Sequence, residues 1–296
     1  DLAGLQCKAE KDGDEWIING QKVWTSGGKV ADMGMLIART DPELPKHQGI
    51  SYFAFDMKQE GVDVRPLTEM TGRALFNEVF ITDGRVHDDA LIGGKSNGWR
   101  VANATLMFER SHLGSGTIPV PTALPGSVAG QLERKVGEVI SSINKVRGGN
   151  PAIGPRLFNR LAELSQKLGQ DKDPVIRDEM MKLHTLVEVN RLNMIRAKSN
   201  TDRTGAEGNI GKLMMSELYR QFREVGNMVI GAEGMLTASE VDHGGWIHEV
   251  TVFSPAPSIY GGTDQVQRNI IGERVLGLPK EPGHPKETPF TELPKN

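Results

Sequence analysis

The chain has 296 residues, a formal net charge of −3 at neutral pH, 38% hydrophobic residues and 25% charged residues. That is typical of a globular protein with a substantial core, and it carries no basic excess that would point to nucleic acid or an anionic membrane surface. The single cysteine, Cys7, excludes an internal disulfide framework and fits a reducing compartment, and no apolar run approaches the roughly 18 residues of a membrane span.

Residues 1–95 are predicted to form strands and turns. Residues 16–24 contain two apolar runs around the pair Asn19-Gly20, which is a strong hairpin signal. We therefore expect a β-hairpin with its turn at Asn19-Gly20. Three further apolar segments have the length and pattern of strands, at 33–38, 50–55 and 76–81.

From residue 96 onward the chain is predicted to be mainly helical. Asp173-Pro174 is a helix-start signal, because aspartate caps and proline is favoured at the first helical position. Apolar residues recur at helical spacing after it and again in 209–230. The other expected helices lie at 99–114, 131–147, 155–169 and 264–277, and three prolines interrupt the stretch between the first two, at positions 119, 121 and 125.

The predicted fold class is α+β, with an antiparallel β domain followed by an α-helical domain. We place the β domain at 1–95 and the helical domain at 96–280. Residues 281–296 are polar and contain four of the chain's prolines, so we expect a flexible tail there.

The segment Tyr260-Gly261-Gly262-Thr263-Asp264-Gln265 resembles the carboxy-terminal signature of the acyl-CoA dehydrogenases, flavoproteins that oxidise acyl-CoA thioesters to 2-enoyl-CoA. In much of that family, a glutamate after the tyrosine removes the α-proton of the substrate. Here Gly261 occupies that position and has no side chain to act as a base. The resemblance implies that the Gly261 backbone N–H bonds the thioester carbonyl and that Thr263 and Gln265 contact FAD. A plain glycine turn leading into a helix also explains the segment.

Glu109 is the predicted general base. It directly precedes an arginine, as does the base in the long-chain and isovaleryl-type branches of the family, which tend to lack the glutamate after the tyrosine. The glutamate that is missing at Gly261 is thus matched by a glutamate at Glu109, as in those branches. Taken alone, Glu109 is better explained as a solvated helix glutamate, and only together with the Tyr260-Gly261 signature does it favour catalysis.

Two further segments are predicted to bind FAD. Gly20-Gln21-Lys22-Val23-Trp24-Thr25-Ser26 resembles the family segment that lies against the flavin, which implies that Trp24 faces the isoalloxazine, with Thr25 beside it and the Ser26 hydroxyl near N5. The alternative is a hairpin with a buried tryptophan. Gly231 and Gly234 resemble a turn that touches the FAD of a neighbouring subunit, although these glycines also suit a helix end.

The resemblance covers nearly all of residues 1–280 and implies a middle β domain and a carboxy-terminal four-helix bundle. The family's amino-terminal helical domain is missing, so we expect a fragment or processed product. Its pattern also includes an arginine that reaches a neighbouring subunit's FAD, and none of the candidate arginines matches cleanly, at 134, 147 and 156. No metal site is predicted, because His243 and His248 lack zinc spacing and further ligands.

The predicted function is FAD-dependent α,β-dehydrogenation of an acyl-CoA thioester, with Glu109 as base and hydride transfer to flavin N5. The implied partners are an acyl-CoA substrate, an electron-transfer flavoprotein and further subunits in a homotetramer or heterotetramer. The implied location is the bacterial cytoplasm or the mitochondrial matrix. Two alternatives remain: an acyl-CoA oxidase, and a catalytically silent subunit that completes a partner's flavin site.

Overall fold

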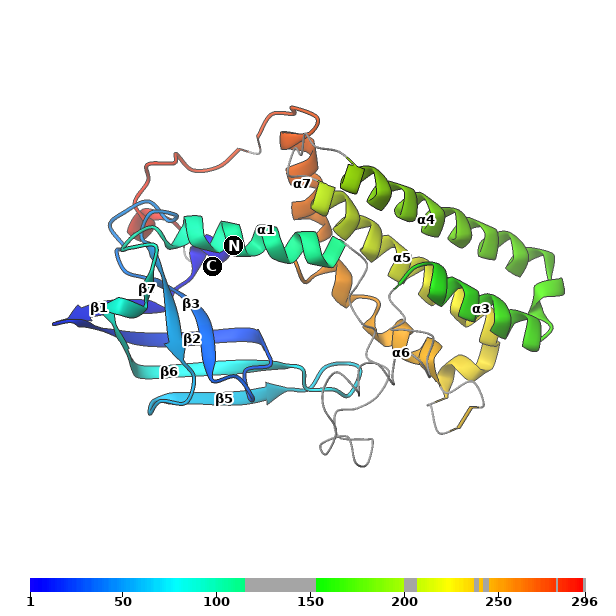
Figure 1. Ribbon diagram of the computed structural model, residues 1–296, viewed down its shortest axis with the longest axis horizontal. Coiled ribbons are helices and arrows are strands. Elements are labelled where there is room, and N and C mark those ends of the chain that lie inside the picture. The colour runs from blue at the N-terminus through cyan, green and yellow to red at the C-terminus, as the bar shows by residue number, and fades with distance from the viewer. Residues whose placement is uncertain (115–152, 200–206, 237–239, 242–244, 281, 295–296) are drawn as a thin grey trace. The chain divides into compact units, whose positions relative to one another are not determined.

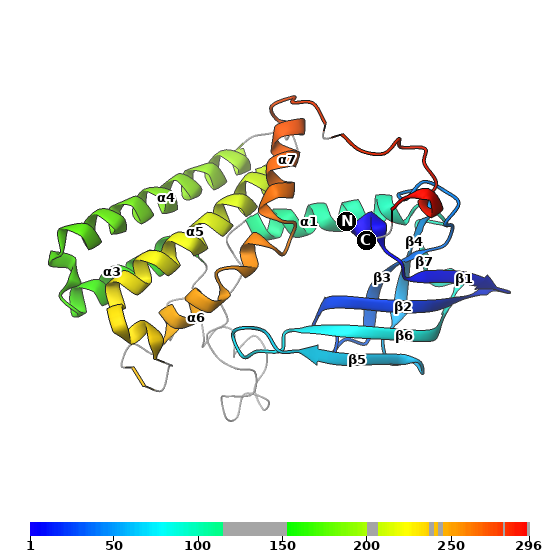
Figure 2. The same ribbon diagram turned by 180° about the vertical axis from the view of Figure 1, so that it is seen from behind.

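The computed structural model describes residues 1–114, 153–199, 207–236, 240–241, 245–280 and 282–294. These residues form two units, shown from opposite sides in Figures 1 and 2. Unit 1 comprises Asp1–Leu106 and Glu281–Asn296, and unit 2 comprises Met107–Lys280. The division falls inside helix α1 (Gly98–Gly114), later than the predicted domain boundary after residue 95.

Unit 1 contains a seven-stranded sheet in the order β5-β6-β2-β1-β3-β4-β7. All neighbouring strands pair antiparallel except β1 and β3, which are parallel where Lys8 meets Arg39. The sheet followed by helices confirms the predicted α+β class. The strands are β1 (Lys8–Asp12), β2 (Glu15–Ser26), β3 (Met33–Arg39), β4 (Ile50–Asp56), β5 (Val62–Leu67), β6 (Phe76–His87) and β7 (Leu91–Ile92).

The predicted hairpin turn at Asn19-Gly20 is wrong. Residues 15–26 form one continuous strand, and the reversal lies at Gly13, between paired residues Asp12 and Glu15. Gly20 instead sits at a register shift between β2 and β6, with φ of 150°. The Asn19 side chain makes two hydrogen bonds to Asp83 of β6. Its Nδ2 donates to Asp83 Oδ1 at 3.0 Å, and its Oδ1 accepts from the backbone N–H of Asp83 at 2.9 Å. The Asn-Gly pair therefore encodes a β-bulge.

Replacing Gly20 by alanine is expected to lower the free energy of unfolding by at least about 2 kcal/mol. The added Cβ would lie 2.8 Å from the Cα of buried Cys7, and the backbone conformation is one that only glycine adopts readily. Gly13→Ala is the control: its φ of +62° is also unfavourable, but the space around it is open. Urea denaturation should show the larger loss for Gly20→Ala, and equal losses would contradict the steric account.

Alternate residues of β2 and β6 are buried, so these two strands turn one face towards the core of unit 1. β4 differs, because it is buried at consecutive positions from Ile50 to Phe53 and so is covered on both faces. Trp16 and Phe53 contact edge to face with their ring centroids 5.7 Å apart. The buried hydrophobic residues of this core are Cys7, Ala9, Trp16, Ile18, Leu36, Ala38, Phe53, Phe55, Met57, Val79, Ile81 and Val86.

Unit 2 is helical, and its elements largely follow the predicted boundaries. Asp173 caps α4 as expected, since its carboxylate accepts hydrogen bonds from the backbone N–H groups of Val175 and Ile176. The predicted helix at 131–147 lies outside the described residues. The described helices are α3 (Pro155–Lys167), α4 (Pro174–Ser199), α5 (Glu207–Ile230), α6 (Trp246–Phe253) and α7 (Asp264–Arg274), which is three residues shorter than predicted.

Helix α5 is central to unit 2 and contacts α3, α4, α6 and α7. Figures 1 and 2 show α3, α4 and α5 side by side, with α7 crossing near the start of α5. The buried apolar residues of α5 recur every three to four positions and so form one stripe, which explains the central position of this helix. The stripe comprises Met215, Leu218, Tyr219, Phe222, Val225 and Val229. None of the described helices is long and apolar enough to cross a membrane.

Residues 282–294 differ from the predicted loose tail, because they return to unit 1. The backbone N–H groups of Phe290 and Thr291 donate to the carbonyls of Leu44 and Pro42. The Phe290 ring lies 3.8 Å from the guanidinium carbon of buried Arg39. Proline and polar residues suggested a solvated tail, but one aromatic ring over a buried cation anchors the segment.

Candidate functional site

The turn Gly261-Gly262-Thr263 is the centre of the candidate site in unit 2. Gly261 and Gly262 have φ of 63° and 85°, in the left-handed region that favours glycine. Thr263 is the N-cap of α7, and its hydroxyl accepts a hydrogen bond from the backbone N–H of Val266 at 3.2 Å. Among the described residues, nothing accepts from the backbone N–H groups of the three turn residues. The half-exposed turn therefore presents free donors.

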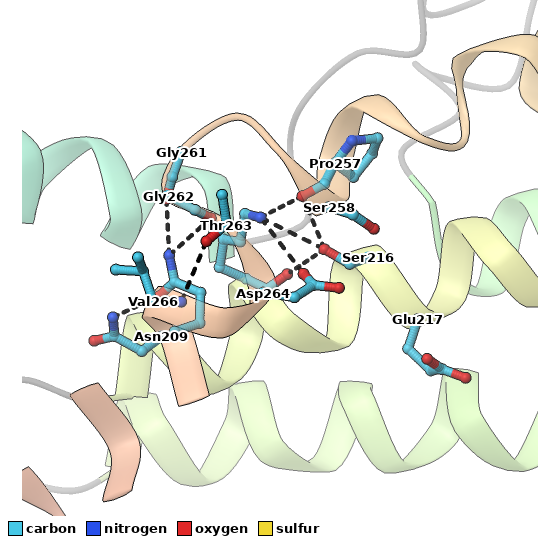
Figure 3. A network of polar contacts seen from close by, with 12 residues as sticks. Asn209, Ser216, Glu217, Pro257, Ser258, Gly261, Gly262, Thr263, Asp264 and Val266 are labelled. Carbon is cyan, nitrogen blue, oxygen red and sulfur yellow. Dashed lines mark hydrogen bonds and ion pairs between the residues drawn. The ribbon is translucent and has the colours of Figure 1, made fainter. Parts of the chain in front are cut away.

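The carbonyls of the same turn face the protein interior. The side-chain amide of fully buried Gln267 donates from Nε2 to the Gly261 and Gly262 carbonyls, at 2.8 and 3.2 Å. Its Oε1 accepts from Nδ2 of Asn209 on α5 at 2.6 Å. Figure 3 shows Gly261, Gly262 and Asn209 within this connected set of polar contacts.

Lys212 and Ser216, one turn apart on α5, hold the chain just before the turn. Both side chains donate to the Pro257 carbonyl, Ser216 from Oγ at 2.8 Å. Lys212 is fully buried, which lowers the pKa of its ammonium group. Its Nζ also lies 5.9 Å from the centre of the Tyr260 ring.

Asp264 is the buried anion of this network. Arg220 donates to its Oδ2 at 2.8 Å and to the Ser258 hydroxyl at 2.8 Å, and Lys212 Nζ lies 3.9 Å from Oδ1. Burial alone would raise the pKa of Asp264, but the Arg220 hydrogen bond and the two cations outweigh it and lower this pKa. The carboxylate thus links α5 to the first turn of α7.

The predicted residues of unit 2 divide into two groups. Gly261, Thr263 and Gln265 lie together, and Gln265 is exposed on the first turn of α7. Gly231 and Gly234 follow the other end of α5, about 30 Å from Asn209 at 1.5 Å per helical residue. Gly231 is exposed and has φ of 55°. The two groups therefore face different regions of unit 2.

Glu109 lies on α1, as predicted, and its side chain is exposed. The apolar neighbours Met107 and Phe108 are also exposed, at 51% and 71%. Exposed apolar side chains around a carboxylate are suited to a surface that another molecule or segment covers.

Trp24 is exposed at 63% and has φ of 60°, which is unfavourable for a bulky residue. This contradicts the alternative of a buried tryptophan. A register shift between β2 and β6 begins after Lys22 and ends at Thr25, whose carbonyl accepts from the side chain of buried Asn77 at 3.0 Å. Ser26 pairs with Phe76, whose ring contacts the indole edge to face with ring centroids 6.0 Å apart. The sheet thus holds the indole outward in a strained conformation.

Two family models match the chain, the acyl-CoA dehydrogenase middle domain over residues 1–83 and the acyl-CoA dehydrogenase C-terminal domain over residues 155–276. The chain belongs to the acyl-CoA dehydrogenase family. Acyl-CoA dehydrogenase IpdE1 of Mycobacterium tuberculosis is 35% identical over 283 residues. That alignment covers 95% of this chain but only 64% of IpdE1, so the chain spans a little under two thirds of this relative.

Solved acyl-CoA dehydrogenases share the fold. The structure titled Tcur3481-Tcur3483 steroid ACAD gives a TM-score of 0.76 at 25% identity, over 95% of this chain and 65% of that one. The ChsE4-ChsE5 complex from Mycobacterium tuberculosis gives a TM-score of 0.73 at 25% identity, over 95% and 66%.

Sequence reasoning missed the buried polar residues behind the acyl-CoA dehydrogenase signature. Lys212 was detectable, because it lies three residues before Met215 on the buried stripe of α5, where a charge is unexpected. Asn209 and Gln267 gave no comparable signal, since their partners lie 58 positions apart in the sequence. The described residues hold no cluster of metal-ligating side chains, and His243 lies outside them.

Proposed function

We propose that the protein containing this chain is an FAD-dependent acyl-CoA dehydrogenase that converts an acyl-CoA thioester to the 2-enoyl-CoA. The observation that carries the proposal is the Gly261-Gly262-Thr263 turn, whose Gly261 and Gly262 carbonyls face inward and whose N–H groups have no partner among the residues that the structure describes. Such donors suit an oxygen that gains negative charge during a reaction. Family membership supplies the reaction that develops this charge.

The chain's residues take complementary roles in this proposal. The Gly261 N–H donates to the thioester carbonyl and stabilises the enolate-like charge that forms as the α-proton leaves. The Glu109 carboxylate takes that proton, forming an O–H bond as the Cα–H bond breaks. Bound FAD would supply the hydride acceptor for the β-carbon, so the substrate would lose two electrons and two hydrogens, one as the proton taken by Glu109 and one as hydride.

The residues present fit FAD on two observations. The indole of Trp24 is 63% exposed and offers a flat apolar surface to an aromatic ring system, in a backbone conformation that is unfavourable for a bulky residue. Ser26 is exposed two residues further along β2 and carries a hydroxyl donor. Thr25 stays a proposed contact beside them, as do Gly231, Gly234, Thr263 and Gln265 in unit 2.

Replacing Trp24 by asparagine is expected to weaken FAD binding by about tenfold with little loss of stability. The substitution removes a stacking surface that contributes about 1.4 kcal/mol, and asparagine tolerates the left-handed conformation. Flavin titration and thermal unfolding of the apoprotein measure the two effects. Unchanged FAD affinity would remove Trp24 from the proposed site.

The relatives suggest a substrate class and an assembly. Two similar structures are named for pairs of chains, and one title includes the words steroid ACAD. We therefore favour a steroid-derived acyl-CoA and an assembly of two different chains over a straight-chain substrate and a homotetramer. An electron-transfer flavoprotein remains the proposed electron acceptor.

Anaerobic flavin reduction tests the proposal. The full-length protein that contains this chain, with its partner subunit, is mixed with straight-chain, branched and steroid acyl-CoA esters, and the visible flavin absorbance is followed. Rapid bleaching by one class supports dehydrogenation and ranks the substrates. Fast reoxidation by oxygen would favour the oxidase, and bound flavin that never bleaches would favour the silent subunit.

A further inference from the structure

Gln267 contacts the catalytic turn from the side opposite to the proposed substrate. It lies on the first turn of α7, is fully buried, and donates to two consecutive carbonyls, Gly261 and Gly262. A Cβ on Gly262 would lie 2.7 Å from Gln267 Nε2, so the amide fills the space behind the turn. This side chain takes no part in the chemistry proposed above.

The direction of the carbonyls fixes the direction of the N–H groups. In a planar trans peptide unit, the C=O and the following N–H point in opposite directions. The inward Gly261 and Gly262 carbonyls therefore turn the N–H groups of Gly262 and Thr263 outward. Two adjacent glycines would otherwise allow these peptide planes to rotate with little steric cost.

Asn209 determines which end of the Gln267 amide faces the turn. Its Nδ2 donates to Gln267 Oε1 at 2.6 Å, so Gln267 Nε2 is the atom directed at the two carbonyls. Asn209 is itself 2% exposed on α5. Asn209 therefore donates to Gln267, and Gln267 donates to the turn, so the buried hydrogen bonds all run in the same direction.

The upstream side of the turn is held separately. Lys212 and Ser216 bind the Pro257 carbonyl, and the backbone N–H of Tyr260 donates to the Ala256 carbonyl at 3.0 Å. Gly261 therefore lies between this held segment and the two peptide planes that Gln267 holds.

We propose that Gln267, oriented by Asn209, is a positioning residue. It turns the N–H groups of Gly262 and Thr263 outward and fixes the two peptide planes that follow Gly261, whose own N–H is the donor assigned to the thioester carbonyl. The inference rests on the proposed function, because it assigns these donors to that substrate. It assigns to two buried side chains a share of the transition-state stabilisation delivered by the backbone.

Gln267→Glu is the sharpest test, because it keeps the size of the side chain and removes the N–H donor. The crystal structure of the variant should show the Gly261-Gly262 and Gly262-Thr263 peptide planes rotated. The rate of flavin reduction should fall by about 100-fold while acyl-CoA affinity changes by less than about fivefold. Asn209→Ala, a milder change that leaves Gln267 in place, should give a smaller fall with the same pattern.

A vibrational measurement separates positioning from general structural support. The probe is a thioester labelled with ¹³C at its carbonyl and methylated twice at the α-carbon, so that it binds without reacting. Infrared difference spectra should show the C=O stretch lowered in the wild type and returned towards its value in water in Gln267→Glu. Gln166→Glu, on an exposed position of α3, should match the wild type in every measurement.

Unrotated peptide planes, or an unchanged C=O frequency in Gln267→Glu, would overturn the inference. Wild-type protein that reduces its flavin but leaves the C=O frequency unshifted would also overturn it, while the proposed function would stand. Wild-type protein that binds flavin but neither binds nor oxidises any acyl-CoA would refute both.

Discussion

Glu109→Gln is expected to slow flavin reduction by acyl-CoA by about a thousandfold or more. Glutamine has nearly the same shape as glutamate, but its amide cannot accept the α-proton. Gly261 cannot substitute for it, because it has no side chain. The rate is measured by anaerobic stopped-flow absorbance of the full-length protein at saturating acyl-CoA, so that a change in affinity does not enter.

The control for this prediction is Glu163→Gln on α3, which makes the same change at another exposed helix position. It should leave the rate unchanged. Acyl-CoA affinity in Glu109→Gln should stay within about threefold of the wild type, because the proton transfer belongs to the transition state. Unchanged bleaching in Glu109→Gln would mean that another group is the base.

Asp264→Asn is expected to lower the free energy of unfolding at pH 7 by roughly 3 kcal/mol. The side chain is 7% exposed, and its carboxylate faces Arg220 and Lys212. Neutralising it leaves two cations near each other, one of them fully buried. Asp63→Asn is the control. Both side chains of the Asp63–Arg65 ion pair are more than half exposed, so this pair should contribute less than about 1 kcal/mol to the free energy of unfolding.

The loss of unfolding free energy caused by Asp264→Asn should become smaller as the pH falls. The pKa of Asp264 is lower in the folded protein than the unfolded value of about 3.9. Its stabilising contribution is therefore fully present above about pH 3.9 and disappears as the pH falls through the folded pKa. Urea unfolding of wild type and variant between pH 7 and pH 3 should give curves that converge in acid, and a constant difference would contradict the ion-pair account.

The elements that local patterns specify were predictable. The α4 start depends on Asp173, and the stripe of α5 depends on helical spacing, so both are encoded within a few residues. Asn19-Gly20 was misassigned because its conformation is set by Asp83, which lies 64 residues away. The 282–294 segment was taken for a tail because Arg39, the partner of Phe290, lies much further away in the sequence than that.

Only the exposed and half-exposed residues of the candidate site were predictable from the sequence. Gly261, Thr263 and Gln265 follow from a contiguous signature, and Trp24 from a second one. The residues that hold this signature in place are buried polar groups whose partners come from another helix. Their identity depends on α5 and α7 meeting in space, which no short pattern in the chain records.

The return of residues 282–294 to the loop between β3 and β4 has a consequence for biosynthesis. Unit 1 is interrupted in sequence by all of unit 2, yet the Leu44 and Pro42 carbonyls are bonded by residues near position 290. A ribosome therefore releases the loop between β3 and β4 long before it releases the segment that binds it. Unit 2 emerges in the interval, so Arg39 and this loop must persist without the Phe290 contact until translation has passed position 294.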